Sequence, residues 1–171
     1  MRALAGPVSD ERAHALRRRY LEAFGGAEFP VPVEAIAEDL LGLAVERAEL
    51  PCSGMLLPAE RRIVVNAAEV PTRQRFTVAH ELGHWVCQVL EGDPAPVYCR
   101  AEDVGVDPAA KAREREANVF AAELLMPEEA VRAAAAREPD PAAAFGVSGE
   151  AMGWRLYNLG LGDVPIARSP S

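Results

Sequence analysis

Two histidines four residues apart, His80 and His84, flank a glutamate in the segment TVAHELGHWV, residues 77–86. On an α-helix four residues complete about one turn and rise about 6 Å, so both imidazoles project from one face and can grip one metal ion. Glu81 lies about 100° round the helix from His80, beside such an ion rather than on it. There it can share a water molecule with Zn²⁺, whose charge lowers the pKa of that water towards about 7. Glu81 would take the water's proton during attack on a carbonyl and deliver it to the leaving amine.

The same spacing also occurs by chance on helices that bind no metal. This helix is largely apolar, however, so we expect it to be buried, and buried histidines need partners for their polar atoms. Gly83 also supports a closely packed helix, because glycine inside a helix costs about 1 kcal/mol relative to alanine and needs a compensating reason. It predicts the close approach of another backbone. The context therefore favours a metal site.

The third ligand has to come from another part of the chain. A catalytic zinc site usually has three protein ligands and an open position for water, and the remaining histidine, His14, lies far away in the sequence. The helix predicted after the next loop offers Glu114, which shares a face with Ala117 and Ala121. Small residues on that face permit close packing of two helices, so we predict Glu114 as the third ligand.

Two residues rival Glu114. Glu116 shares its helical face with Phe120 and Glu123 and is less clearly inward. Cys87 faces the same side as both histidines, but three side chains on one straight helix cannot easily converge on a single ion. We therefore expect Cys87 to pack in the core.

Asn118 follows Glu114 by one helical turn. Its side chain can hydrogen-bond a histidine ligand and fix the ring, or it can be an ordinary surface residue, and the sequence leaves both open. Nitrogen and carboxylate ligands suit Zn²⁺ and also Mn²⁺. The sequence identifies no substrate-binding residue and no clear oxyanion-stabilising residue. By chemistry alone the candidates for the latter are Arg75, Tyr98, Arg155 and Tyr157.

Several helices and short strands must position these residues. Proline, glycine and capping residues predict helices over residues 9–24, 31–42, 71–92, 108–126 and 148–160, with an alanine-rich helix after Pro127. Short apolar runs predict strands over residues 43–50, 53–57 and 61–66, the last two as a hairpin or as neighbours. The run RRIVVN at 61–66 is either an exposed edge strand that binds an extended substrate or a plain core strand.

Composition limits the class of protein. The chain has 171 residues, half of them apolar, which fits one domain. Its net charge of −8 disfavours a general nucleic-acid binder. The sequence contains no membrane-spanning run and its first twenty residues contain no signal-peptide run. The three cysteines form no CxxC pair, so we expect reduced thiols and a cytoplasmic location.

Residues 142–160 have a helix-turn-helix-like spacing with a turn at Gly146. The candidate reading helix, 149–159, carries one basic residue, Arg155, and one acidic residue, Glu150. A helix that reads a DNA groove needs more basic and polar contacts. We therefore expect this segment to be a packing element, with no direct DNA binding.

The motif RFTVAHELGH at 75–84, followed by ExxANxFAAELLMP at 114–127, resembles the ImmA/IrrE-type metallopeptidases, a zincin-like group. The resemblance covers roughly residues 33–162. It implies an α+β, zincin-like fold that is mostly helical, with a small three-stranded sheet beside the HExxH helix. Residues 1–171 would form a single metallopeptidase domain, with a C-terminal helical segment at about 139–162. The implied zinc ligands are His80, His84 and Glu114, with Glu81 as the general acid/base.

The resemblance also implies a substrate. Members of this family are bacterial or phage-related regulators that cleave a partner transcriptional repressor of the helix-turn-helix type, so we expect a zinc endopeptidase acting on such a repressor. An acidic chain suits a basic DNA-binding substrate. The alternatives are a metal-bound adaptor that binds a repressor without cutting it, and a DNA-binding module. A purely structural site would not need Glu81 and would usually have four protein ligands, which favours the enzyme.

Overall fold

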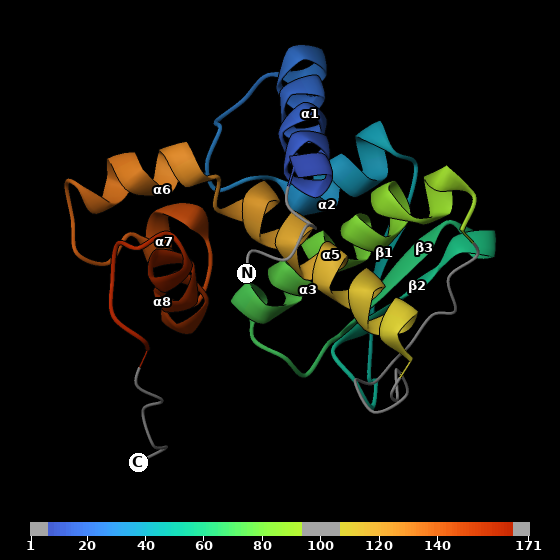
Figure 1. The fold of residues 1–171 in the computed structure, drawn as a ribbon. Helices are drawn as coiled ribbons and strands as arrows, with labels where there is room; N and C mark the ends of the chain where they lie inside the picture. Colours follow the sequence, from blue (N-terminus) through green and yellow to red (C-terminus); the bar gives the residue numbers. More distant parts are fainter. Residues whose placement is uncertain (1–6, 94–106, 166–171) are drawn as a thin grey trace.

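The computed structural model of the chain describes residues 7–93 and 107–165 (Figure 1). The fold is α+β and mostly helical, with a three-stranded sheet, as expected. The helices are α1 (Pro7–Phe24), α2 (Val33–Ala35), α3 (Pro71–Cys87), α5 (Pro108–Leu125), α6 (Glu128–Ala135), α7 (Ala142–Phe145) and α8 (Gly149–Asn158). The strands are β1 (Ala44–Ala48), β2 (Gly54–Leu57) and β3 (Arg62–Asn66). Single turns of other helix types cover Ile36–Leu40, Pro58–Glu60 and Val89–Glu91.

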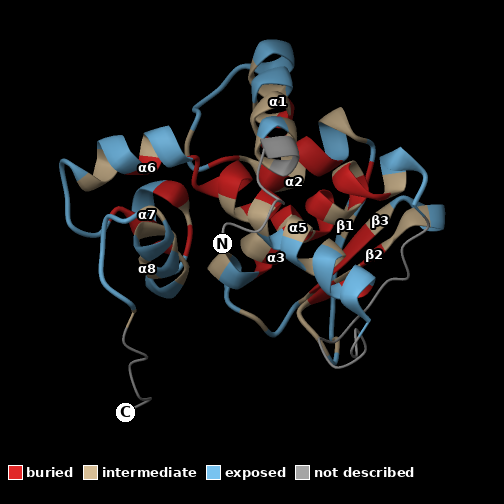
Figure 2. Ribbon diagram, in the orientation of Figure 1, coloured by how far each residue is buried: buried red, intermediate tan, exposed pale blue. Residues whose placement is uncertain are grey.

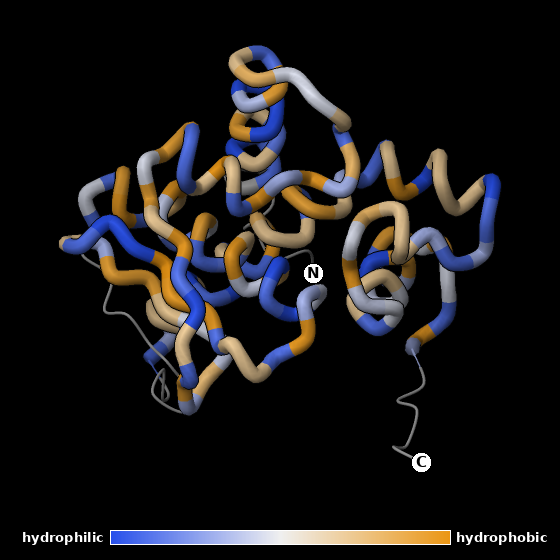
Figure 3. The backbone as a smooth tube through the Cα atoms, turned by 180° about the vertical axis from the view of Figure 1, so that it is seen from behind, coloured by the Kyte–Doolittle hydropathy of each residue, from blue (hydrophilic) through white to orange (hydrophobic). Residues whose placement is uncertain are grey.

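Helices α3 and α5 cross at the centre of the molecule (Figure 1). The sheet lies to one side of this pair and helices α6 to α8 lie to the other, while α1 packs against α5. Buried residues concentrate where these layers meet (Figure 2). From behind, hydrophobic and hydrophilic stretches alternate along most elements (Figure 3), as expected when each element has one buried face.

The sheet has the order β1-β3-β2. Strand β3 pairs in parallel with β1 and antiparallel with β2, and its three middle residues are buried. The run at 61–66 is therefore the central strand, which decides against the edge-strand alternative for it. Within the described part of the chain the edges belong to β1 and β2, and β2 packs against α3 together with the central strand β3.

Helix α3 begins with Pro71 at its first position, where a missing backbone N–H is harmless. It ends at Cys87, one turn before the expected stop, and a short 3-10 turn continues to Gly92, which has φ 81°. Most of its side chains are buried, including Thr77, Leu82 and Trp85. The apolar character of residues 77–86 thus reflects a helix covered on several sides.

Helix α5 starts where the Asp107 side chain accepts a hydrogen bond from the backbone N–H of Ala109. Its small residues Ala117 and Ala121 are fully buried. The face that carries Phe120 and Glu123 is buried as well, which corrects the expectation that it is less inward. The reason is α1, which packs against α5 and contacts it with His14, 3.1 Å from a Glu123 oxygen.

The crossing of α3 and α5 depends on Gly83. A Cβ atom at this position would lie 2.9 Å from Cα and 3.0 Å from the carbonyl oxygen of Ala117. Ordinary side chains never come that close to a backbone, so the two helices meet at a distance that only glycine permits. This confirms the backbone approach predicted from the sequence.

Arginine side chains attach the C-terminal helices to the rest of the fold. Arg155 on α8 donates to the carbonyl of Met126, 2.9 Å away, and pairs with the buried Glu123. From α3, Arg75 donates to the carbonyls of Gly146 and Val31. These bonds favour residues 1–171 as one domain with 139–162 as part of it, which stays a prediction.

Several details differ from the sequence-based expectation. Ser9 lies inside α1 rather than capping it, and residues 31–42 divide into α2 and a π-helical turn, Ile36–Leu40. Cys52 is disulfide-bonded, so the expected reduced thiol is wrong for this residue; Cys99 lies outside the described residues. None of the helices in the described ranges combines the length and apolar character needed to cross a bilayer.

We expect Gly83→Ala to lower the free energy of unfolding of the metal-free chain by up to about 2 kcal/mol. Alanine gains about 1 kcal/mol in helix propensity, but overpacking against a rigid backbone costs about 1–3 kcal/mol. Urea unfolding followed by circular dichroism measures the change. The matched control is Gly149→Ala in α8, where no heavy atom lies within 4 Å of the added Cβ. It should keep or slightly raise stability, and an equal loss in both variants would contradict the packing argument.

Candidate metal centre

The structure brings His80, His84 and Glu114 together from two helices. The Nε2 atoms of the two histidines, one turn apart on α3, lie 3.0 Å from each other. Glu114 on α5 places one carboxylate oxygen 3.2 Å from Nε2 of His80 and the other 3.2 Å from Nε2 of His84. The α3–α5 crossing therefore produces a three-residue cluster whose polar atoms converge on one point.

The other ring nitrogens show which atoms are free to bind a metal. Nδ1 of His80 lies 3.0 Å from the amide oxygen of Asn118, and Nδ1 of His84 lies 2.7 Å from the amide oxygen of Gln88. The Gln88 amide nitrogen donates to the carbonyl of Arg113, which orients its oxygen towards the histidine. Because an amide oxygen only accepts, each Nδ1 carries the hydrogen. In the neutral rings both Nε2 atoms then present lone pairs.

Two lone pairs and a carboxylate at this separation repel one another unless a positive charge lies among them. Ligand atoms about 2.0–2.2 Å from a tetrahedral Zn²⁺ lie about 3.3–3.6 Å apart, slightly more than the separations of 3.0–3.2 Å seen here. The three residues offer one ligand atom each, and these atoms all lie within 4.8 Å of one another. The residues present thus fit a divalent metal with two nitrogen ligands and one oxygen ligand.

Glu81 lies beside this cluster and is only 6% exposed. Burial raises the pKa of its carboxyl group, an effect that His80, His84 and a hydrogen bond from the backbone of Leu56 oppose in part. Leu56 belongs to β2, so the edge strand orients this carboxylate. A carboxylate with a raised pKa accepts a proton more readily, which suits a general base.

The cluster itself shifts the protonation of its members in the metal-free chain. Burial alone would raise the pKa of Glu114, but the hydrogen bonds with His80 and His84 outweigh it and lower the pKa to about 2. Burial alone would lower the pKa of His84, yet the hydrogen bond with Glu114 and the charge of Glu81 raise it above 6.5. In the metal-free chain, a proton on this cluster therefore supplies part of the positive charge that a metal ion would provide.

The rival ligands lie elsewhere. Cys87 is buried in the core, and the potential metal-binding group found among the described residues does not include it. Glu116 lies behind Gln88, with a carboxylate oxygen 3.5 Å from the Gln88 amide nitrogen. Gln88 itself is a residue that the sequence analysis missed. Its spacing of four from His84, on the same helical face, was the available signal.

The candidates for stabilising an oxyanion are committed to other contacts. Arg75 and Arg155 bond backbone carbonyls, as described above, and Arg155 also pairs with Glu123. Tyr157 is exposed and packs edge-to-face with Trp154, with ring centroids 5.9 Å apart. Tyr98 lies outside the described residues. The structure thus gives none of the three described candidates a role at the metal centre.

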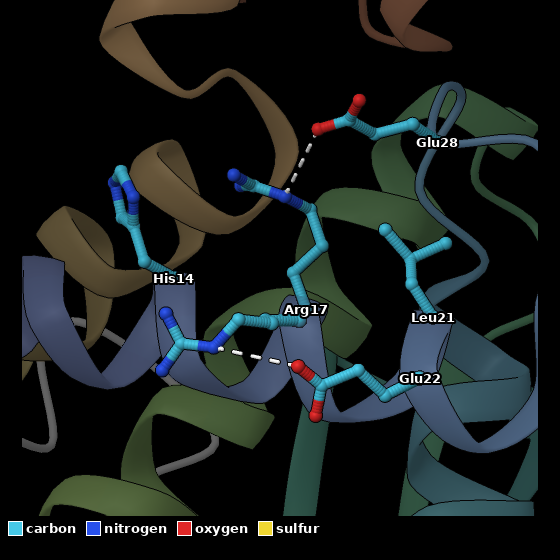
Figure 4. A pocket seen from close by; sticks show the side chains of 6 residues that line it. His14, Arg17, Leu21, Glu22 and Glu28 are labelled. Atoms are coloured by element: carbon cyan, nitrogen blue, oxygen red, sulfur yellow. Dashed lines mark ion pairs between the residues drawn. The ribbon is translucent and has the colours of Figure 1, made fainter.

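A separate hollow of about 420 Å³ lies on α1 (Figure 4). Its basic groups already face acidic ones: Arg17 Nε is 3.7 Å from Glu28, and Arg18 Nε is 3.9 Å from Glu22. Figure 4 shows both pairs as dashed lines. Because the charges are balanced locally, this hollow has no excess charge for binding an ionic ligand.

Known proteins share parts of this sequence and fold. Over 75 residues the chain is 37% identical to the radiation response metalloprotease IrrE of Deinococcus radiodurans, an alignment that covers 44% of this chain and 22% of that protein. A Mycobacterium tuberculosis transcriptional regulator has a similar fold, with a TM-score of 0.59 and 21% identity. That similarity covers 85% of this chain and 46% of the other. The chain therefore spans less than half the length of either protein.

A domain family matches a larger share of the chain. Residues 32–157 match the IrrE N-terminal-like domain, a peptidase family. The matched range includes the whole of the sheet, α3 with both histidines and Glu81, and α5 with Glu114. With most of its length inside the match, the chain belongs to the IrrE N-terminal-like family of metallopeptidases.

Proposed function

We propose that this chain is a zinc-dependent endopeptidase that cleaves a specific protein, a transcriptional repressor of the helix-turn-helix type. The observation that carries the proposal is the convergence of His80, His84 and Glu114 beside the buried carboxylate of Glu81. The family and the printed name of the Deinococcus relative, a metalloprotease, support peptide hydrolysis.

Each residue then has one role. The Nε2 atoms of His80 and His84 and the carboxylate of Glu114 would hold the metal, while Asn118 and Gln88 keep both rings in the required tautomer. When bound, zinc supplies a Lewis acid for a water molecule and a substrate carbonyl. Glu81 takes the proton of the attacking water and passes it to the amine of the leaving product.

The substrate class rests on several independent features. An extended peptide can pair with the edge of β2, the strand whose Leu56 contacts Glu81. The net charge of −8 suits a basic partner such as a DNA-binding protein. Direct DNA binding by α8 has little support, because its one basic residue, Arg155, pairs with Glu123. A non-cleaving adaptor would have no use for a buried base at the metal.

We expect Glu81→Gln to retain zinc and lose cleavage. Glutamine keeps the shape and polarity of glutamate but accepts no proton, and loss of a general base typically lowers the rate by about 10²–10⁴. Zinc content measured by mass spectrometry and cleavage of a helix-turn-helix protein encoded beside the gene, followed on gels, provide the two readouts. Cleavage near the wild-type rate would remove Glu81 from the mechanism, and cutting of no candidate repressor by wild-type protein would favour the adaptor.

We expect Glu114→Ala to weaken zinc binding strongly, since it removes one of three protein ligands. Glu116→Ala is the matched control, two residues away on the same helix and directed at Gln88 instead. Competition with a chromogenic chelator measures both affinities. The control should stay within a few-fold of wild type. If Glu116→Ala loses the metal and Glu114→Ala keeps it, the assignment of the third ligand is wrong.

The apparent zinc affinity should fall as the solution becomes acidic. Zinc requires neutral histidines, and in the metal-free chain the pKa of His84 lies above 6.5, so a proton already competes near neutral pH. The pKa of Glu114 is about 2, so this ligand stays ionised throughout. Below the pKa of His84 the affinity should drop about tenfold per pH unit for each proton displaced. A titration from pH 8 to 5 that gives a constant affinity would exclude histidine ligands.

A further inference from the structure

A cleft of about 710 Å³ lies between the start of α3, the second half of α5 and helix α8. It is far larger than the space a single water needs and falls in the range typical of ligand sites. Much of its wall is apolar. The apolar side chains that line it include Phe76, Val119, Ala122, Met126, Ala151 and Trp154.

The cleft adjoins the metal centre through one residue, Asn118. Asn118 lines it and also holds His80, its amide oxygen 3.0 Å from Nδ1 of that ring. Along α5, Asn118 follows Glu114 by one turn, Ala122 by two and Met126 by three. The wall therefore extends over about 6–18 Å from the third ligand, at 1.5 Å of helix per residue.

Strand β2 runs beside α3 between Glu81 and the cleft. Its first residue, Gly54, lies against Thr77, because an added Cβ would be 2.5 Å from the Thr77 methyl group. Two residues later Leu56 reaches Glu81, one helical turn after Thr77. Strand β2 thus runs beside α3, with its Gly54 end nearest the part of α3 that lines the cleft. A substrate segment paired with the edge of β2 passes from Glu81 towards the cleft.

The apolar surface of the cleft is open to solvent. Trp154 is 44% exposed and Val70, at the rim, is 64% exposed. The charged groups around them have opposite signs, with Arg73 on α3 and Glu150 on α8. Arg155 in the wall is paired with Glu123. Exposed apolar side chains beside balanced charges favour an apolar occupant over an ionic one.

We infer that this cleft binds large apolar side chains of the protein substrate on one side of the bond that is cut. The inference rests on the proposed peptidase function and specifies what the site selects. An extended chain advances about 3.3 Å per residue, so a wall about 6–18 Å from the third ligand receives residues roughly two to five positions from the cleaved bond. Aromatic residues, leucine and methionine match its lining.

The first experiment measures selection without cleavage. Zinc-loaded Glu81→Gln protein is immobilised and exposed to a defined library of peptides from a digested bacterial proteome, and retained peptides are identified by mass spectrometry. We expect peptides containing phenylalanine, tryptophan, leucine or methionine to be retained at least fivefold over the input. No enrichment of these residues would overturn the inference.

Two variants on the same background alter the cleft in opposite ways. Trp154→Ala removes an exposed wall, and Ala151→Phe fills the space, so each should lower the enrichment at least tenfold while zinc content stays unchanged. Phe24→Ala is the matched control: this aromatic residue on α1 is 52% exposed and does not line the cleft. Retained selection in both cleft variants, or an equal loss in the control, would overturn the inference. If one cleft variant does not fold, the other decides.

The second experiment treats the same library with active zinc-loaded protein. Cut sites should have a large apolar residue two to five positions away on one side. Cuts without this preference would overturn the placement of the cleft. If apolar peptides are enriched but no peptide or candidate repressor is cut, the peptidase function is wrong and the cleft remains a binding site. Failure of the proposed function and failure of the cleft inference are therefore distinguishable.

Discussion

The close contact between Gly83 and the backbone of Ala117 is the constraint on which the rest of the structure depends. A helix crossing this tight places Glu114 3.2 Å from both histidines. A side chain as small as a methyl group at position 83 would push α5 away from α3. The same crossing brings Asn118 to Nδ1 of His80, and it brings the carbonyl of Arg113 to Gln88, whose oxygen lies against Nδ1 of His84. The packing of α3 against α5 therefore also determines the geometry of the candidate metal centre.

The two carboxyl groups at the centre of the fold have pKa values shifted in opposite directions. Glu81 keeps a raised pKa because burial disfavours its charge, while Glu114 keeps a low one because two histidines surround it. Two carboxylates on neighbouring helices, α3 and α5, thus have opposite tendencies, which is the difference that a proton acceptor and a metal ligand need. Farther out, Glu123 is satisfied by His14 and Arg155, which connects α1, α5 and α8.

Much of this was readable from local sequence. The residues of the HExxH segment, the helix beginning at Pro108, the hairpin of β2 and β3 and the turn at Gly146 all follow from helical periodicity and turn residues over short spans. The inward face of Glu114 followed from the small residues that accompany it. The sequence left open whether 61–66 is an edge or a central strand, and the expectations for the face of Glu123 and the state of Cys52 were wrong. All three depend on partners distant in sequence.

The sequence by itself determined which residues can act, because four positions on a helix always return to the same face, whatever surrounds them. Only the tertiary structure decided what those residues meet. The burial that raises the pKa of Glu81, the hydrogen bond from Gln88 to the carbonyl of Arg113 and the placing of α8 across the cleft each arise from elements far apart in the chain. Local propensity carries no information about such contacts, since their geometry is set by how whole helices and strands pack.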